Sequence, residues 1–416
     1  MKKSFVILTS ILLALVIGFG VTSCKKDEKT TFSLSSLMAG SINLNAATPP
    51  TNVPANAVIE AVFTVDVRAS SASATNIVLK NNLTNANVAI TITVAGMKIT
   101  VTPDALLDNG TSYSLTMTGI TSTDDQVLSA FTRSFSTEGS YAPGDYFAYW
   151  NFEGNLNDVL GVYNATANVN VTFAASHSTA AGQAASFDGT TSIAEIPNGD
   201  ILMNTADFSI AFWVKAVSDN HNDSSGNPKG HFVFGLGAFY GFQFEISGNY
   251  GSCKLAARYE LGDGSTSSED LWFAGDGNLG WQGWTYCRDL TGQGGVEALL
   301  KDQWAFVVCT YDHNTKIGSM YINSLIMKTQ DFNLWPAGDP KTTVVGLKYG
   351  GVEPEVYNEL ALGFIQSRAG TLWDTEPWGN YDSPYSNHFG GLLDDLRIYH
   401  RVLTVAEIEQ MYSSSK

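Results

Sequence analysis

The sequence predicts an all-β protein built from two sandwich modules in series. Charged residues make up only 15% of the 416 positions, whereas glycine alone occupies 39. This composition is typical of short strands joined by many turns, since long exposed helices would need more charge. Stretches in which apolar and polar residues alternate recur along the chain, as expected of strands with one buried face. A chain of this length is expected to hold two or three domains.

The charge balance limits the partners that this chain can have. It carries 23 Lys and Arg against 40 Asp and Glu, which gives a formal net charge of −17. A surface this acidic repels phosphate backbones, so we expect no nucleic-acid partner. Divalent cations and neutral partners such as glycans are compatible with it.

The N-terminus has the features of a bacterial lipoprotein signal. Lys2 and Lys3 precede an apolar stretch over residues 5–19 that is too short and too early for a stable membrane span. The stretch ends in Val21-Thr22-Ser23-Cys24, which resembles the lipobox before a lipidated cysteine. We therefore expect a signal peptide over residues 1–23 and a lipid anchor on Cys24 as the only membrane attachment. The alternative is an ordinary signal peptide followed by a chance cysteine.

The residues after Cys24 predict where the protein resides. Lys25-Lys26-Asp27-Glu28 resembles the lysine-then-acidic signal that sends Bacteroidetes lipoproteins to the outside of the outer membrane. The alternative is a solvated tether, which any charged run would provide. Residues 24–45 are small and polar without a sustained period, and we expect them to be a flexible tether.

Residues 46–138 are expected to form the first sandwich. Alternating apolar residues predict strands near residues 59–67, 88–94, 99–101, 113–117 and 131–135. The segments Val53-Pro54-Ala55-Asn56, Thr102-Pro103, Gly110-Thr111-Ser112-Tyr113 and Ser134-Phe135-Ser136-Thr137 follow in an order that resembles the bacterial Ig-like domain. The resemblance implies a spacer, in which the Tyr113 hydroxyl is bonded to upstream backbone.

Residues 140–416 are expected to form the second sandwich. Its motifs are spread along the chain: Trp150-Asn151-Phe152-Glu153-Gly154, Ala185-Ser186-Phe187-Asp188-Gly189, Phe208-Ser209-Ile210-Ala211-Phe212-Trp213, Trp304-Ala305-Phe306-Val307-Val308 and Leu392-Leu393-Asp394-Asp395-Leu396. In this order they resemble the laminin-G-like, concanavalin A-like jelly-roll family in its bacterial form. The resemblance implies two curved antiparallel sheets, frequently a calcium ion, and binding of carbohydrate or protein.

The second module is also expected to contain an insertion and a C-terminal helix. Residues 216–300 depart from the family pattern and are expected to be an insertion rich in glycine and aromatic residues. After the last strand, Thr404 and Glu407 fit a capping box for a short helix that reaches Tyr412.

Asp394 is the polar residue that strand alternation singles out. It shares its parity with Leu392, Leu396 and Ile398, so we expect its carboxylate to point inward. A buried carboxylate must be paired, hydrogen-bonded or bound to a metal. In the resembling family the equivalent Asp commonly serves a structural calcium site or a backbone network near the first strand, which implies candidate calcium ligands. They are Glu153, Asp158 and Asp394. The alternative is a metal-free set of hydrogen bonds around Asp394.

Two groups of aromatic residues predict a glycan-binding surface. Sugar rings present apolar C–H faces that stack on aromatic planes, while polar side chains bind their hydroxyls. The candidate ligand-binding residues are Trp272, Trp281 and Trp284 in the first group, and Trp373, Asp374, Trp378, Tyr381 and Asp382 in the second. The alternative for each ring is a plug that orders a long loop.

Three cysteines follow Cys24, and the exported location favours a disulfide. Cys309 lies in an apolar strand, where a free cysteine behaves as a small hydrophobe. The expected pair is therefore Cys253 with Cys287.

Catalytic motifs are absent from the sequence. It contains no Gly-x-Ser-x-Gly, no His-Glu-x-x-His and no phosphate-binding loop, and no strand carries the alternating carboxylates of related glycosidases. We expect a binding protein for a glycan or polysaccharide that is not an enzyme. The alternatives are an adhesion protein with a protein partner and a glycoside-active enzyme.

Overall fold

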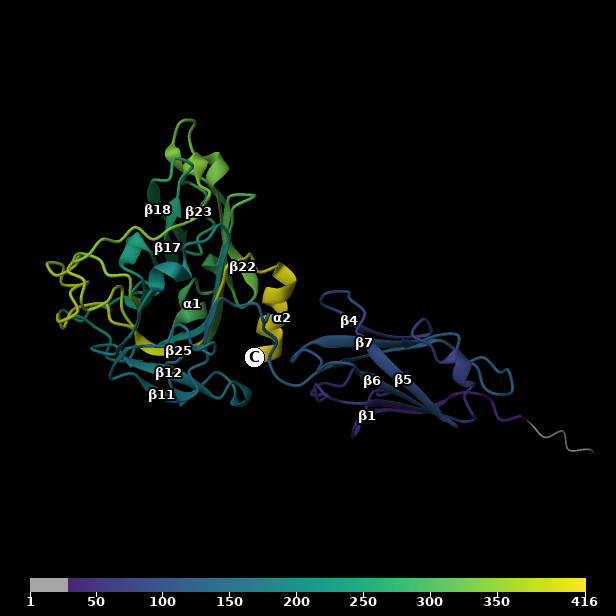
Figure 1. The fold of residues 1–416 in the computed structure, drawn as a ribbon. Coiled ribbons are helices and arrows are strands. Elements are labelled where there is room, and N and C mark those ends of the chain that lie inside the picture. The colour runs from purple at the N-terminus through teal and green to yellow at the C-terminus, as the bar shows by residue number, and fades with distance from the viewer. Residues whose placement is uncertain (1–28) are drawn as a thin grey trace, which may run out of the picture.

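The computed structural model describes residues 29–416 and folds them into two β-sandwich modules that lie end to end (Figure 1). The all-β prediction is confirmed. The predicted signal peptide, the lipidation site Cys24 and the charged residues 25–28 lie outside the described residues. Within residues 29–416, no helix has both the length and the apolar character needed to cross a bilayer.

The first module is a sandwich of two antiparallel sheets. The five-stranded sheet has the order β2-β1-β3-β6-β5 and consists of β1 (Leu34–Ala39), β2 (Ile42–Asn43), β3 (Ile59–Phe63), β5 (Ile90–Ala95) and β6 (Lys98–Pro103). The three-stranded sheet has the order β4-β7-β8 and consists of β4 (Ile77–Asn81), β7 (Ser112–Met117) and β8 (Phe131–Ser136). Alternate residues of these strands, such as Tyr113, Leu115 and Met117, point into the shared core.

The Tyr113 hydroxyl ties the start of β7 to the preceding loop. It accepts a hydrogen bond from the Asp108 backbone amide at 2.9 Å. Burial is the main reason that the pKa of Tyr113 rises to about 12. The predicted bond between this hydroxyl and upstream backbone is therefore confirmed.

The prediction of a flexible tether over residues 24–45 is wrong for its second half. Residues 34–39 form β1, which pairs with β3 from Leu34↔Phe63 to Ala39↔Ile59. Leu37 and Ala39 are fully buried in the core of the first module. The polar appearance of this segment concealed a strand that has only one buried face.

The second module packs an eight-stranded sheet against a nine-stranded sheet around one large core. The eight-stranded sheet has the order β10-β13-β24-β15-β16-β17-β18, with β23 paired to β17, and its strands are β10 (Ala167–Val169), β13 (Ile193–Ile196), β15 (His231–Gly235), β16 (Phe242–Ile246), β17 (Cys253–Glu260), β18 (Thr266–Phe273), β23 (Gly346–Leu347) and β24 (Leu360–Leu362). The nine-stranded sheet has the order β11-β12-β25-β14-β20-β21-β22-β19, with β9 paired to β25, and its strands are β9 (Ala148–Trp150), β11 (Thr172–Ala175), β12 (Gln183–Asp188), β14 (Phe208–Ala216), β19 (Trp284–Cys287), β20 (Ala305–Asp312), β21 (Ile317–Ile322), β22 (Leu325–Asp331) and β25 (Gly390–Tyr399).

Residues 216–300, the expected insertion, contribute strands to both sheets. They contain β15 to β19, so this segment builds half of the eight-stranded sheet. The short helix α1 (Glu297–Leu300) follows. Glycine and aromatic residues in this segment therefore mark tight hairpins and core positions as well as loops.

Helix α2 (Val405–Ser415) covers the outer face of the nine-stranded sheet, next to the first module (Figure 1). The predicted capping box is present, because Thr404 Oγ1 accepts from the Glu407 amide and Glu407 Oε2 accepts from the Thr404 amide. Gln410 Nε2 donates to the Gly110 carbonyl of the first module. The helix thus holds the two modules against each other.

Candidate functional site

The outer face of the eight-stranded sheet carries an open groove that α2 does not cover. In β16 and β17 the core-facing residues alternate with residues that face outward, and the outward residues include Gln243, Glu245, Lys254 and Ala256. On β18 the outward positions include Asp270 and Trp272, because Leu271 and Phe273 point into the core. These six residues form the floor of the surface that we call the sheet groove.

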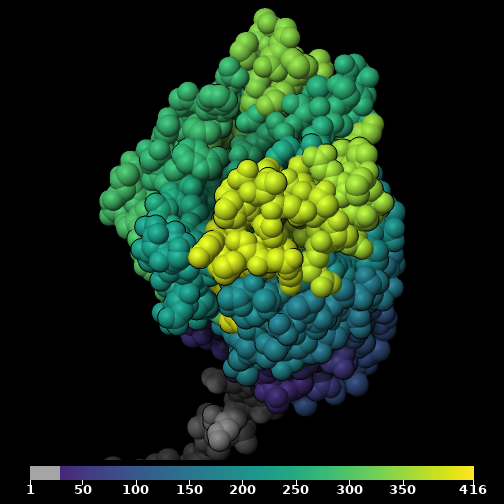
Figure 2. All heavy atoms as spheres, turned by 90° about the vertical axis from the view of Figure 1, so that its left-hand side faces the viewer, coloured from purple at the N-terminus to yellow at the C-terminus, as the bar shows by residue number. Residues whose placement is uncertain are grey.

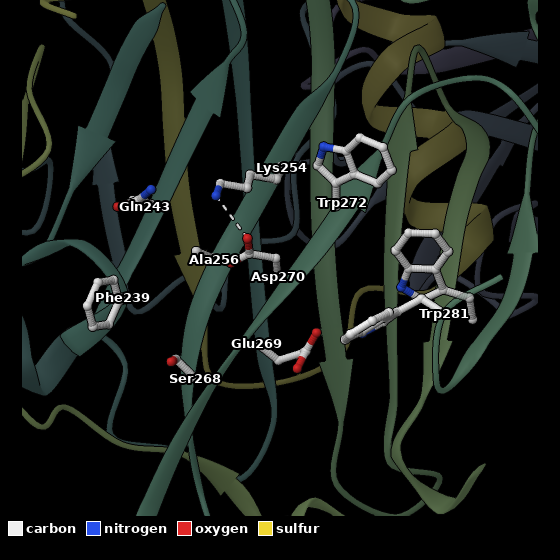
Figure 3. Close-up of a pocket in the computed structure, with 10 residues that line it drawn as sticks. Phe239, Gln243, Lys254, Ala256, Ser268, Glu269, Asp270, Trp272 and Trp281 are labelled. Atoms are coloured by element: carbon white, nitrogen blue, oxygen red, sulfur yellow. Dashed lines mark hydrogen bonds and ion pairs between the residues drawn. The ribbon is translucent and has the colours of Figure 1, made fainter. Parts of the chain in front are cut away.

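Two adjoining hollows make up the sheet groove. One has a volume of about 470 Å³ and is lined by Trp272, Trp281 and Trp284 together with floor residues (Figure 3). The other has a volume of about 320 Å³ and is lined by Trp373 and Trp378 on its far side. Phe239, Gln243 and Lys254 line both hollows, so the hollows are continuous.

The sheet groove brings together the two groups of tryptophans that the sequence places about 90 residues apart. Trp272 stacks on Trp284 with ring centroids 5.7 Å apart, and Trp281 is 54% exposed beside them. At the other end, Trp373 and Trp378 lie 4.7 Å apart. Figure 2 shows the loop before β25 (yellow) beside the green segments that include β18 and β19 on this side of the molecule.

Three of the predicted ligand-binding residues do not line either hollow of the groove. Tyr381 plugs its own loop: its hydroxyl donates to the Thr191 carbonyl at 2.5 Å and its ring contacts His388. Asp374 and Asp382 are exposed on the same loop. For Tyr381, the alternative role of a ring that orders the loop fits the contacts better than ligand binding.

Polar atoms without partners point to a ligand in the sheet groove. Gln243 is 5% exposed, and its Oε1 has no hydrogen-bond partner among the described residues. Its Nε2 donates to Glu245 Oε2 at 2.8 Å, which fixes the amide with Oε1 as the free acceptor, since the opposite orientation would place two oxygens together. The indole Nε1 atoms of Trp284 and Trp373 are likewise buried and unpaired. Such groups are costly to leave unsatisfied, and a bound molecule would satisfy them.

Charged residues form a compact network on the groove floor, and Figure 3 shows its Lys254–Asp270 pair. Lys254 Nζ lies 2.8 Å from Asp270 and 3.3 Å from Glu245. Burial raises the pKa of Glu245, and Lys254 opposes that rise. Burial lowers the pKa of Lys254, but Glu245 and Asp270 outweigh it, so the net shift is upward. The network keeps Lys254 protonated and gives the floor fixed hydrogen-bonding groups.

The floor residues Gln243, Glu245, Lys254 and Asp270 were missed by the sequence analysis. Each occupies the polar position of an alternating strand, which is the usual sign of a solvated face and does not distinguish a binding face. A usable signal was the clustering of such positions in the consecutive hairpins that lead up to the first group of tryptophans.

The three candidate calcium ligands are not brought together. Within residues 29–416, the groups of at least three His, Cys, Asp or Glu side chains with ligand atoms within 4.8 Å of one another comprise only Asp207, Asp312 and His313. Asp158 accepts bonds from the amides of Tyr149, Val162 and Tyr163, and Glu153 accepts one from Gln183. Asp158 thus closes a local turn and Glu153 bonds the backbone of β12, so the three carboxylates are not placed for a shared calcium site.

Asp394 is buried as predicted, but on the other side of its sheet. Asp395 has a φ of 51° and forms a bulge, so Asp394 pairs with Trp213 and Arg397 pairs with Ala211. Leu396 and Ile398 therefore face the core between the sheets, while Asp394 faces outward beneath α2. Its carboxylate accepts bonds from the Ser176 hydroxyl and, at 2.7 Å, from the Asp395 amide. The simple alternation failed because a bulge shifts the parity by one residue.

The expected Cys253–Cys287 disulfide is wrong. Cys253, Cys287 and Cys309 are all free thiols. Cys253 lies in the core at the start of β17, where its Sγ contacts Met320 Sδ at 3.8 Å. Cys287 lies on β19, the edge strand of the other sheet, with its Sγ 3.8 Å from Asp276 Oδ1. Closeness in the chain did not translate into closeness in space because the two strands belong to different sheets.

Residues 42–137 match the bacterial Ig-like domain family, which agrees with the first module. This match covers the first module only, so the chain contains a bacterial Ig-like domain at residues 42–137 within its all-β fold. No curated protein sequence matches the chain.

Solved structures show only distant similarity, and it involves about two thirds of this chain. Domain 4 of AbnA, a GH43 extracellular arabinanase from Geobacillus stearothermophilus in complex with arabinotriose, is 18% identical over 64% of this chain and 98% of that domain, with a TM-score of 0.38. The receptor-binding domain of botulinum neurotoxin type G is 15% identical over 65% of this chain, with a TM-score of 0.38. The binding domain of Paraclostridial Mosquitocidal Protein 1 is 14% identical over 65% of this chain, with a TM-score of 0.41. The matches span about half the length of the latter two domains, and they identify no ligand for this chain.

Proposed function

We propose that this chain is a surface-exposed lipoprotein whose second, laminin-G-like module binds a glycan in the sheet groove without cleaving it. The observation that carries the proposal is the buried, unpaired Oε1 of Gln243 at the point where both hollows meet. A sugar hydroxyl is the donor that this acceptor lacks, and the tryptophans on both sides offer faces for sugar rings. The first module then serves as a spacer between the membrane and the groove.

A glycan array with residues 25–416 tests the binding proposal. We expect saturable retention of a glycan, and we expect that glycan to protect the tryptophans of the groove from oxidation by N-bromosuccinimide. Retention of a protein partner with no glycan signal would overturn the proposal in favour of adhesion. Retention that leaves the groove tryptophans unprotected would place the glycan site elsewhere.

Catalysis is the second candidate function, because Glu245 and Asp270 stand on either side of Lys254 in the groove. Two carboxylates of this kind are the usual machinery of glycoside hydrolysis. In this groove both are engaged by the same lysine, which favours a binding role for them. Incubation of a retained polysaccharide with the protein should release no reducing ends, and steady release would replace the binding proposal with an enzymatic one.

The proposed lipid anchor and export signal are tested by substitutions at Cys24 and at residues 25–28. Cys24→Ala should abolish incorporation of a labelled fatty acid, and persistent label on this variant would overturn the lipobox assignment. Replacement of residues 25–28 by alanine should preserve the lipid but reduce cleavage of the protein by protease added to intact cells. Unchanged cleavage would remove the export-signal assignment.

A further inference from the structure

The shape and charge of the sheet groove also define the class of glycan, an inference that rests on the proposed function. We infer that the ligand is a linear, uncharged glycan chain that contacts both groups of tryptophans at once. The inference has three supports, which are the length of the groove, the position of its unpaired polar atoms and the charge of its lining.

The length of the groove follows from the strand register. Phe232 pairs with Glu245, Glu245 pairs with Lys254, and Lys254 pairs with Trp272, so these four residues form one row across β15 to β18. Three strand spacings of about 4.8 Å give the row a length of about 14 Å. Trp378 packs against Phe232 at one end and Trp284 packs against Trp272 at the other. A ligand that touches both ends must be longer than a single sugar ring.

The unpaired polar atoms are distributed along the length of the groove beside this row, with Gln243 in the neighbouring row opposite Ala256. Trp284 Nε1 lies at one end, Gln243 Oε1 near the middle and Trp373 Nε1 at the other end. Each end thus offers a donor and the middle offers an acceptor. A chain of hydroxyl-bearing units supplies complementary groups at all three places, whereas a compact ligand in one hollow would leave at least one of them unsatisfied.

The charge of the lining argues against acidic polysaccharides. The charged residues that line the two hollows are Glu245, Glu269 and Asp270 against Lys254, which is three acids to one base. Lys341 neutralises Glu269, and the remaining network still has one more acid than base. The net charge of −17 over the chain adds to the repulsion of an anionic polymer. Uronate-rich or sulfated chains are therefore disfavoured, and neutral chains are not.

The experiment uses residues 25–416 and measures affinity for cellulose, starch, xylan, mannan and arabinan, each in its neutral and its carboxymethylated form. We expect at least one neutral polymer to bind and its carboxymethylated form to bind at least about tenfold more weakly at low salt, with the difference shrinking as salt screens the repulsion. For the polymer that binds, affinity should rise with chain length from the disaccharide upward until the ligand spans the groove.

Substitutions at the two ends of the sheet groove test whether a single glycan contacts both groups of tryptophans. Trp272→Ala and Trp378→Ala should each weaken binding of the long chain about tenfold, as expected for aromatic anchors. The matched control is Tyr385→Ala, an exposed aromatic residue of the same loop as Trp378 that lines neither hollow. It should leave the affinity unchanged, and all three variants should melt at the temperature of the parent.

The possible outcomes separate the inference on glycan class from the proposal of glycan binding. Equal affinity for a disaccharide and the polymer, or loss of affinity with only one of the two tryptophan variants, would overturn the extended-chain inference while leaving glycan binding intact. Equal affinity for neutral and carboxymethylated forms would overturn the inference on charge. Failure of every glycan, neutral or charged, to bind would overturn the proposed function itself.

Discussion

The second module has two outer sheet faces, and each combines tryptophan with charged residues. On the nine-stranded sheet, Trp213 stacks on His177 at 4.0 Å, Asp394 is fully buried, and α2 lies over both. On the eight-stranded sheet, Trp272 and the Glu245–Lys254–Asp270 network lie in an open groove. Similar residues thus occur on a covered face and on an uncovered one.

The difference between the faces lies in how their polar atoms are satisfied. His177 Nε2 bonds the Ser415 carbonyl of α2, and both oxygens of Asp394 have partners. Arg397 Nε on the same face is buried without a partner, but the guanidinium bonds Asp395 through Nη1 and Nη2. In the sheet groove, Gln243 and two indoles retain buried atoms without partners. Aromatic content alone therefore does not identify a binding face, whereas unsatisfied polar atoms beside exposed rings do.

The largest expected effect is on the covered face. Asp394→Ala leaves the Ser176 hydroxyl and the Asp395 amide without their acceptor beneath α2, so it should lower the free energy of unfolding by about 1–3 kcal/mol. Urea denaturation measures the loss. Asp382→Ala is the matched control, because Asp382 is exposed, and it should change stability by less than about 0.5 kcal/mol.

The calcium dependence of stability shows whether Asp394 is held by hydrogen bonds or by a metal ion. With Asp394 held by hydrogen bonds, the loss in Asp394→Ala should be the same with calcium chloride and with chelator. A calcium-dependent rise in the melting temperature of the parent that this variant lacks would instead assign Asp394 to a metal site, since an ion that binds only the folded state stabilises it.

The second prediction concerns the pH dependence of the same site. Burial is the main cause that raises the pKa of Asp394 to about 8, from an ordinary value of 3.8. The folded state therefore retains a proton on Asp394 that the unfolded chain has lost. The contribution of this proton to the free energy of unfolding is complete at low pH and declines as the pH rises toward 8. Asp394→Asn stays neutral, and the stability of the parent relative to this variant should fall with rising pH, by at most about 1.4 kcal/mol per unit.

Urea denaturation of both proteins across this pH range measures that difference. Both proteins keep His177, whose pKa burial lowers, and the Asp395–Arg397 pair. His177 lies 3.8 Å from Asp394, and Asp395 raises the pKa of Asp394, so the measured difference reports Asp394 together with these neighbours. A difference that does not change with pH would mean that Asp394 titrates normally and that its burial is less complete than the fold implies.

The third prediction concerns the open face, where function should respond and stability should not. Gln243→Met keeps the length of the side chain but removes the acceptor, and glycan affinity should weaken by about 1 kcal/mol, roughly fivefold. Stability should change by less than about 0.5 kcal/mol, because an unsatisfied atom is removed together with one hydrogen bond. Isothermal titration and urea denaturation measure the two quantities.

Gln366→Met provides the control for that prediction. Gln366 is 5% exposed and also has an unpaired Oε1, but it lines neither hollow of the groove. It should leave glycan affinity unchanged. Equal losses of affinity in both variants would show that the unpaired oxygen of Gln243 is not a contact to the ligand.

The fold class and many strands could be predicted from the sequence, because alternation and turn residues act locally. Strands β3, β5, β6, β7 and β8, the Tyr113 bond and the capping box at Thr404 all follow from residues close together in the chain. Features that depend on strand register, or on which sheet a strand joins, could not be predicted from these local patterns. The bulge at Asp395 reversed the face of Asp394, and assignment of β17 and β19 to different sheets separated Cys253 from Cys287. The candidate site was accessible in part, since the tryptophans were visible but not the floor that joins them.

The smallest expected effect concerns the cysteines, which report on both sheets. Cys253 and Cys309 lie in the core, and burial raises the pKa of Cys253 to about 12 and also raises the pKa of Cys309. The thiolate is the reactive form, so both should resist iodoacetamide in the folded protein, whereas the half-buried Cys287 on edge strand β19 should be alkylated. Peptide mass mapping should find label on Cys287 alone before unfolding and on all three after it, with no change in melting temperature when Cys287 is modified. A non-reducing map that links Cys253 to Cys287 would contradict the placement of β17 and β19 in separate sheets, and with it the path of the strands that form the floor of the sheet groove.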